Sequence, residues 1–231
     1  MRVAALYDVH GNLPALEAVL VAVEREGVDE LVFGGDIAAG PPQPAETIDL
    51  VRSLPNARFV RGNADRLDDP KYQDDAGLAW LKERLSPDQS DWLGDLPFST
   101  VIDDTLYVHA TPQDDETVIT ELTTDERLAE LLAGVDQRRV VAGHTHMQLE
   151  RRAGDVVFLN AGSVGRPYEG CTGAFWALLD PNTVELRRTE YDLERAAELV
   201  RRSGHPEAEQ LADENILAGP SRGEALAFFG G

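Results

Sequence analysis

Five short apolar runs in this chain end in polar residues of the same few types, and this pattern restricts the fold more than any other feature. The runs are followed by D-V-H-G-N at residues 8–12, G-G-D-I at 34–37, R-G-N-A-D at 61–65, V-H-A-T at 108–111 and G-H-T-H at 143–146. Aspartate, asparagine and histidine bind metal ions through oxygen or nitrogen. Sites in α/β proteins form where the carboxyl ends of strands open onto loops, so the pattern predicts that the five segments converge.

Apolar runs of strand length alternate with helical patterns, which predicts an α/β protein. Asn12 is expected to cap a helix that ends at Gly27, and Asp192 a helix that ends at Gly204. Further helices are expected at residues 45–54, 76–85 and 124–133. Strands are expected at residues 2–7, 31–34, 58–60, 98–102, 105–109, 138–142, 147–151, 155–159, 173–179 and 183–189. The second half of the chain is therefore richer in β-hairpins.

The kind of metal site is restricted by the cysteine content. A single cysteine, Cys171, excludes an internal disulfide and a thiolate-rich site, so a metal would need imidazole and oxygen ligands. His144 and His146 stand two residues apart directly after an apolar run. In an extended chain such residues point to the same side, so both imidazoles are expected to face one place.

The charge balance bears on partners and location. The chain has 42 acidic and 21 basic residues, a net charge of -21. Such a field repels polyanions, which argues against a long nucleic acid or an acidic membrane surface and favours a small substrate. Whether the acidic surface reflects a high-salt environment or biased codon usage stays open. The first residues lack the pattern of a signal peptide and no apolar run reaches membrane-spanning length, so a cytoplasmic location is expected.

The ordered set D-x-H, G-D, G-N-x-D, H and G-H-x-H resembles the calcineurin-like metallophosphoesterase superfamily, in particular its small single-domain prokaryotic, phosphodiesterase-type branch. The resemblance covers residues 1 to about 190, and five motifs in the right order make it specific. It implies two packed mixed β-sheets, a β-sandwich, flanked by helices. We expect a catalytic domain at residues 1–191 and a C-terminal helical extension at 192–231 that packs on the same domain.

The resemblance also implies a binuclear metal centre. Its ligands are Asp8, His10 and His146 on one ion, Asn63, His109 and His144 on the other, and Asp36 as a bridge. The implied cofactors are two divalent ions, with manganese as the first expectation and iron, nickel, cobalt or zinc as alternatives. A hydroxide that bridges the two metals is the implied nucleophile, because paired cations lower the pKa of bound water and stabilise charge at phosphorus.

The motifs depart from the superfamily pattern at two positions. Ala64 stands where many members carry a histidine thought to protonate the leaving group, and Ala161, in N-A-G-S at 160–163, stands where many carry proline. The first departure favours diesters or activated esters over simple alkyl monoesters, unless Asp65 or a metal-bound water donates the proton.

Four residues near the motifs are candidates for substrate binding. Arg66 and Arg166 carry planar guanidinium groups suited to phosphate oxygens, although surface ion pairs would explain them equally well. Asn12 begins a helix whose N-terminus offers backbone donors, with a plain helix cap as its alternative, and Ser163 lies in the N-A-G-S turn. His205, outside the motifs, is expected to be structural.

These observations predict a binuclear-metal phosphoesterase that hydrolyses phosphodiester or activated phosphate-ester bonds of a small substrate. Two alternatives stay open: a protein or nucleotide phosphatase of the same superfamily, and a non-catalytic interaction scaffold on this fold. The A-L-A-F-F run at 225–229 is more apolar than a free tail should be. We therefore expect the C-terminal segment to cover the core or a second subunit, which would make the protein a homo-oligomer.

Overall fold

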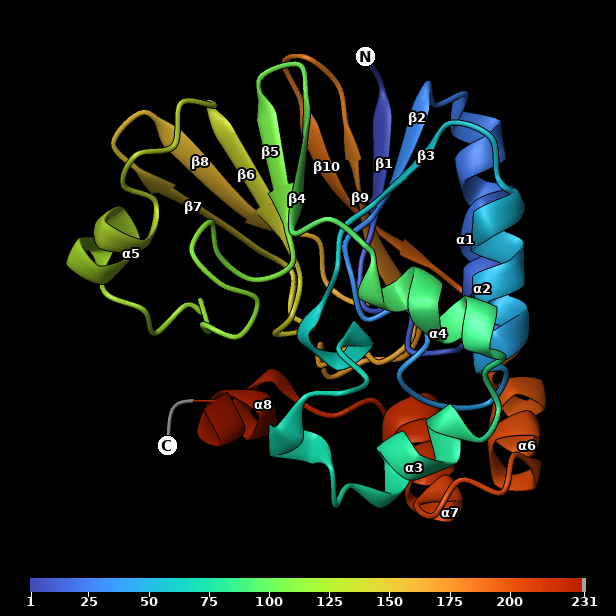
Figure 1. Cartoon of the computed structure of the whole chain (residues 1–231). Coiled ribbons are helices and arrows are strands. Elements are labelled where there is room, and N and C mark those ends of the chain that lie inside the picture. The colour runs from blue at the N-terminus through green and yellow to red at the C-terminus, as the bar shows by residue number, and fades with distance from the viewer. Residues whose placement is uncertain (230–231) are drawn as a thin grey trace.

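Two five-stranded mixed β-sheets lie side by side in the computed structural model, which describes residues 1–229 (Figure 1). The first sheet has the order β10-β9-β1-β2-β3 and the second the order β4-β5-β6-β8-β7. The strands of the first sheet are β1 (Val3–Leu6), β2 (Glu30–Phe33), β3 (Ala57–Phe59), β9 (Ala174–Leu179) and β10 (Val184–Thr189). Those of the second are β4 (Ser99–Ile102), β5 (Thr105–Val108), β6 (Arg139–Ala142), β7 (Leu149–Ala153) and β8 (Val156–Asn160). The predicted fold class is confirmed.

Three strands in each sheet run parallel. β1, β2 and β3 pair in parallel register in the first sheet, as do β5, β6 and β8 in the second. The remaining pairs are antiparallel. Because parallel strands end at the same edge of a sheet, the polar segments that follow these six strands meet at the lower end of the sandwich in Figure 1.

The two sheets enclose a core of aliphatic side chains and two tyrosines. It contains Val3, Ala5, Tyr7, Val32, Val60, Ile102, Tyr107, Val141, Leu159, Ala161, Ala177 and Leu179. Tyr7, which follows β1, is fully buried, and its hydroxyl donates a hydrogen bond to the Val141 carbonyl at 2.9 Å. This bond ties the end of β1 to β6 and so holds the two sheets together next to the converging loops.

Helices cover the outer faces of both sheets. α1 (Leu13–Glu26), α2 (Pro44–Ser53) and α4 (Pro87–Gly94) pack on the first sheet, and α5 (Asp125–Leu131) packs on the second. The Asn12 side chain caps α1 by accepting from the Ala15 N–H at 3.2 Å, and Gly27 ends the helix in a left-handed conformation. The sequence analysis predicted no helix at α4, which begins with a reciprocal capping box between Ser86 and Gln89. That S-P-D-Q signal was available in the sequence.

The chain after Asp192 forms a group of helices below the strand ends, next to α3 (Ala76–Lys82) and the short η2 (Pro70–Tyr72) (Figure 1). The group comprises α6 (Leu193–Arg202), α7 (Ala208–Gln210), the π-helix η3 (Leu211–Ala218) and α8 (Arg222–Phe229). Its own apolar cluster consists of Ala196, Ala197, Val200, Leu211, Ala212 and Ile216. The Ser203 carbonyl accepts hydrogen bonds from Trp80 at 3.2 Å and Arg84 at 3.0 Å. Between residues 1 and 229, no helix is both long and apolar enough to span a membrane.

The packing of Tyr7 against Gly34 offers a test of the inter-sheet core. A methyl group at Gly34 would lie 1.8 Å from a Tyr7 ring carbon, so Gly34→Ala forces the ring or a strand to move. We expect this change to lower the free energy of unfolding by roughly 1–3 kcal/mol, the usual cost of overpacking. Gly94→Ala is the control, because nothing lies within 4 Å of an added methyl there and alanine favours the helix. Urea unfolding that gave both variants the same midpoint would contradict this packing.

Candidate metal centre

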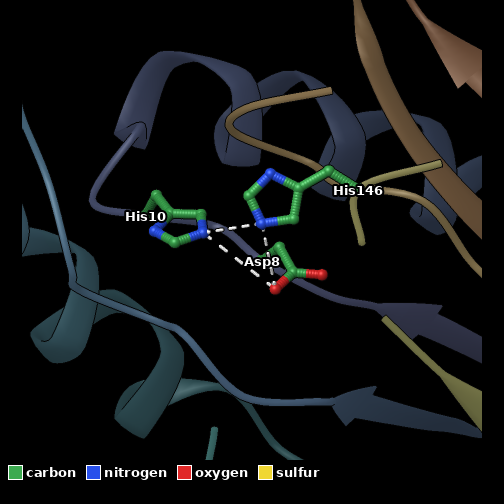
Figure 2. A group of neighbouring side chains, drawn as sticks. All are labelled: Asp8, His10 and His146. Carbon is green, nitrogen blue, oxygen red and sulfur yellow. Dashed lines mark hydrogen bonds and ion pairs between the residues drawn. The ribbon is translucent and has the colours of Figure 1, made fainter. Parts of the chain in front are cut away.

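The first part of the site is a cluster of Asp8, His10 and His146, whose side chains point toward one another from two loops (Figure 2). The Nε2 atom of His146 lies 3.4 Å from Asp8 Oδ1, and that of His10 lies 4.0 Å from the same oxygen. The two Nε2 atoms are 3.1 Å apart. Since all three residues are buried, water does not screen these contacts.

Hydrogen bonds to the backbone fix which nitrogen each histidine presents to the centre. In His10, His109 and His146 the Nδ1 atom lies within hydrogen-bond distance of a backbone carbonyl, which can only accept. The carbonyls belong to Ala39 at 2.8 Å, Gly34 at 2.8 Å and Arg166 at 2.7 Å, in that order. Each Nδ1 therefore carries the proton, and each Nε2 directs a lone pair inward in the neutral ring. Histidines that bind metals are oriented in this way.

The inward-facing atoms are too close together to be stable without a positive charge between them. The His10 and His146 Nε2 atoms face each other at 3.1 Å, and His109 Nε2 faces Asn63 Oδ1 at 3.0 Å. Asp8 Oδ1 is buried and has no hydrogen-bond partner among residues 1–229. An oxygen and nitrogen donor set with an orphaned carboxylate oxygen fits a divalent metal ion.

Asp8 also belongs to a second group of converging side chains, together with Asp36 and His109. Asp36 Oδ2 lies 3.6 Å from His109 Nε2 and 3.8 Å from His10 Nε2, so this carboxylate stands between the histidines of the two groups. Asn63 reaches the second group through His109. Six of the seven predicted ligands thus lie in or next to the two groups.

His144, the seventh predicted ligand, stands at the edge of the site. Its Nε2 atom lies 2.9 Å from the Glu116 carbonyl, its backbone N–H donates to Asp8 Oδ2 at 2.9 Å, and its ring packs on His109 at 5.2 Å between centroids. The expectation that His144 and His146 face one place used strand geometry, and this premise is wrong. β6 ends at Ala142, and both histidines lie in the following loop.

The candidate ligands have an unusual backbone. Seven described residues other than glycine have positive φ angles, and five of them are predicted ligands. These five are Asp8 at 54°, His10 at 49°, Asp36 at 52°, His144 at 68° and His146 at 58°. This left-handed conformation costs an L-residue roughly 1–2 kcal/mol. Strain concentrated at one place is typical of a functional site.

Burial controls the protonation of the histidines. It is the main reason that the pKa of His10 lies well below its usual value, and the charges of His146 and Arg166 act in the same direction. Burial and the nearby His109 lower the pKa of His144 to about 4. His109 differs, because Asp36 and Asp8 raise its pKa against the effect of burial. His10 and His144 are therefore neutral at pH 7 and available to a metal.

Asp65 fixes the backbone next to the candidate ligands Asp36 and Asn63. Its carboxylate accepts hydrogen bonds from the backbone N–H groups of Asp36 at 2.8 Å, Gly62 at 2.8 Å and Ile37 at 3.1 Å. Burial and the neighbouring Asp36 carboxylate raise the pKa of Asp65 to about 7. With both oxygens bonded to the backbone, Asp65 is better suited to position Asp36 than to donate a proton to a leaving group.

Two of the predicted substrate-binding residues hold the loops of the site in position. Ser163 is fully buried, donates to the Asp8 carbonyl at 2.7 Å and accepts from the Arg166 N–H at 2.8 Å. Asn12 caps α1 and donates to the Gly165 carbonyl at 3.0 Å. These contacts use the polar side-chain atoms of both residues and bear out the cap alternative for Asn12, while a role of either residue in substrate binding stays a prediction.

The two predicted phosphate-binding arginines have different surroundings. Arg66 forms ion pairs with Asp69 at 2.7 Å, Asp115 at 3.2 Å and Glu116 at 2.5 Å, so its guanidinium is already engaged. Within residues 1–229, no carboxylate lies within 4.0 Å of the Arg166 side chain, and its buried Nε has no hydrogen-bond partner.

Sequence reasoning missed three residues at the site. Asn160 donates to Thr145 Oγ1 at 3.0 Å and accepts from the Gly162 N–H at 2.9 Å, which fixes the histidine loop; N-A-G-S at 160–163 was its signal. The Tyr168 ring lies 4.8 Å from that of His146. The Phe229 ring of α8 lies 6.4 Å from the rings of His144 and Tyr168. The A-L-A-F-F run at 225–229 indicated that this segment packs on another surface, but nothing in the sequence near Tyr168 or Phe229 indicates these particular partners.

Proteins of similar sequence and fold are known from prokaryotes. An uncharacterized protein of Methanocaldococcus jannaschii is 26% identical over 235 residues, which cover 89% of this chain and 94% of that protein. A metallophosphoesterase from Sphaerobacter thermophilus is 28% identical with a TM-score of 0.80, covering 95% of this chain and 99% of the other. A hypothetical protein from Pyrococcus horikoshii shares the fold, with a TM-score of 0.82, 24% identity and the same two coverages.

A family model described as a calcineurin-like phosphoesterase superfamily domain matches residues 1–183. This range contains all seven predicted metal ligands and every strand of both sheets except β10. The resemblance inferred from the five motifs is confirmed, and the chain belongs to the calcineurin-like phosphoesterase superfamily.

Proposed function

We propose that the protein is a binuclear-metal hydrolase that cleaves phosphodiester or activated phosphate-ester bonds of a small substrate. The main observation in support is the convergence of inward-facing His10, His109 and His146 nitrogens on the carboxylates of Asp8 and Asp36. Membership of a superfamily of metal-dependent phosphoesterases supports the same reaction class.

The side chains present divide into ligands for two neighbouring ions. Asp8, His10 and His146 would hold one ion, and Asn63, His109 and His144 the other, while Asp36 stands between them. Two divalent ions there would supply an activated water for attack on phosphorus and neutralise the charge that develops on the phosphoryl oxygens. Asp8 and Asp36 leave the pair of ions with a net positive charge, which favours an anionic ester.

The surroundings of Ala64 support an ester with a good leaving group. The Ala64 N–H donates to Asp36 Oδ1 at 2.9 Å, and its methyl side chain has no proton to give. The neighbouring Asp65 is occupied by three backbone N–H groups. When the phosphorus–oxygen bond breaks, the leaving oxygen therefore departs with its electron pair and without a nearby side-chain acid, which suits aryl and other stabilised oxyanions.

Hydrolysis assays test this proposal directly. Metal-stripped protein supplied with Mn²⁺, Fe²⁺, Ni²⁺, Co²⁺ or Zn²⁺ should hydrolyse bis-p-nitrophenyl phosphate faster than p-nitrophenyl phosphate. Asp8→Asn should lower kcat/KM at least ~100-fold, since even groups that only orient metal ligands contribute about 10–100-fold. Asp103→Asn is the matched control, because Asp103 also has a left-handed backbone but lies in the exposed turn between β4 and β5. No turnover with any metal would favour the scaffold, and preference for the monoester would favour a phosphatase.

Metal binding can be measured without activity. Mn²⁺ at about 100 times its dissociation constant adds ~2.7 kcal/mol of stability per ion. In a chain of this size we therefore expect the melting temperature to rise by roughly 5–10 °C and to fall again with EDTA. Asp103→Asn should keep this increase and Asp8→Asn should lose most of it. An equal increase in both variants would place the bound metal elsewhere.

Asp65→Asn separates a positioning role from proton donation. Asparagine cannot accept from all three backbone N–H groups, so we expect metal affinity to fall by about 10–100-fold. At saturating metal, the pH profile of kcat/KM should keep its shape. If Asp65 were the proton donor, with its pKa near 7, the variant would lose an alkaline limb near neutral pH while metal affinity stayed the same.

A further inference from the structure

A cavity of about 330 Å³ opens beside the candidate metal centre. Asn63 and Ala64 line one end, next to the metal ligands, and His205 and Leu211 of the C-terminal segment line the other. α3 forms one wall, and both α3 and the C-terminal helices lie below the strand ends in Figure 1. A volume above about 300 Å³ is within the range of small-molecule sites.

Most of the wall is apolar. Leu78 and Leu81 of α3, Leu211 of η3 and Pro41 contribute aliphatic surface, and Tyr72 contributes an aromatic ring. Flat and apolar groups bind well to such surfaces, because they bury area without leaving polar atoms unpaired. Ala64 and the candidate ligand Asn63 both line the cavity, so it reaches the metal centre.

Arg166 is the arginine of the cavity that lacks an ionic partner within the described part of the chain. Its backbone is held at both ends, since its N–H donates to Ser163 Oγ at 2.8 Å and its carbonyl accepts from His146 at 2.7 Å. Its charge acts on both His10 and His205, adding to burial in lowering the pKa of each. Arg166 lines the cavity together with Asn63 of the metal centre and His205 of the C-terminal segment. Arg66, the other arginine of the cavity, is held by three carboxylates.

A half-buried guanidinium without a counter-ion is costly, and an anionic ligand would remove this cost. The acids of the cavity do not supply one. Asp75 caps α3 by accepting from the Leu78 N–H at 2.6 Å, and Glu207 is exposed. Among residues 1–229, neither acid lies within 4.0 Å of Arg166. His205 accepts from the Glu207 N–H through Nδ1 at 3.1 Å, so its Nε2 offers a second donor at the far end.

We propose that this cavity binds the leaving group of the substrate, and that this group is a flat, largely apolar alcohol or phenol carrying an anionic substituent that pairs with Arg166. The inference rests on the proposed phosphoesterase function and specifies its substrate class. It makes Arg166 a specificity-determining residue, and it gives the segment after Asp192 a direct part in substrate selection.

Two aryl esters that differ in one charge test this assignment. Methyl 4-nitrophenyl phosphate and methyl 3-carboxy-4-nitrophenyl phosphate release phenols that differ only in a carboxylate. With the Mn²⁺-loaded protein, we expect KM for the carboxylated ester to be lower by roughly 10–100-fold, as for a charge-assisted hydrogen bond. Arg166→Gln should bring the two KM values together, and Arg166→Lys should restore part of the difference.

Two further variants separate this role from general damage. Arg138→Gln is the matched loss of charge, because Arg138 is exposed, pairs with Asp104 and lies at the opposite end of β6 from the histidine loop. It should leave both KM values unchanged. Ala76→Trp changes an exposed residue of the cavity wall, and the larger side chain should raise KM for both esters. A preference for the carboxylated ester that survives in Arg166→Gln would overturn the proposal.

Binding of the free phenols distinguishes failure of the cavity from failure of the proposed function. In calorimetric titrations of the Mn²⁺-loaded protein, 3-carboxy-4-nitrophenol should bind at least ~10-fold more tightly than 4-nitrophenol, and Arg166→Gln should remove the difference. If the phenols bind in this way but no ester is hydrolysed, the result would support the proposed ligand of the cavity and contradict the proposed phosphoesterase function. Equal or undetectable binding of both phenols to the wild-type protein would overturn the cavity assignment, whatever the activity.

Discussion

The contacts of Asp8 connect all the parts of the site. Its side-chain Oδ1 faces the histidines and its Oδ2 accepts from the His144 N–H at 2.9 Å. Its backbone N–H donates to the Gly35 carbonyl at 3.2 Å, and its carbonyl accepts from Ser163 at 2.7 Å. One residue at the end of β1 thus binds the loops after β2, β6 and β8. Because these loops come from both sheets, the spacing of the sheets and the geometry of the site depend on each other.

Without a bound metal, the arrangement of the candidate ligands lowers the stability of the folded chain. Five candidate ligands adopt a left-handed backbone, at roughly 1–2 kcal/mol each. Asp8 and Asp36 are buried carboxylates, and the His10 and His146 lone pairs face each other at 3.1 Å. Costs of this size are comparable with the whole stability of a domain, about 5–15 kcal/mol. Hydrogen bonds donated by Tyr7, Ser163 and Asn160, and those accepted by Asp65, hold the loops against this strain. A bound cation would relieve the repulsion between acceptors, although not the backbone strain.

The parts that could be predicted from sequence are those encoded locally. The alternation of apolar runs and polar ends located the parallel strands, and Asn12 and Asp192 marked helix starts correctly. The strand geometry assumed for His144 and His146 is wrong because β6 ends at Ala142, and both histidines lie in the following loop with a left-handed backbone. For Ser163 and Asn12 the sequence does not reveal which partners use the polar side-chain atoms; in the structure these are the Asp8 carbonyl and the start of α1. The position of Phe229 beside His144 depends on packing between segments more than 80 residues apart, which no local pattern encodes.

The acidic surface and the site impose opposite conditions on a ligand. A net charge of -21 attracts divalent cations and repels anionic esters over distances of about a Debye length, ~8 Å at physiological ionic strength. Anions would therefore be admitted only where buried positive charge outweighs this field. The carboxylate and histidine cluster would meet this condition once cations are bound, and the cavity beside it offers the half-buried guanidinium of Arg166, whose Nε has no hydrogen-bond partner in the described chain. Their adjacency favours a substrate with two anionic groups separated by an apolar body. Each anionic group of such a substrate would be bound by a short-range ion pair, one at the metal centre and one at Arg166. The long-range field of the acidic surface would attract the metal ions and not the substrate.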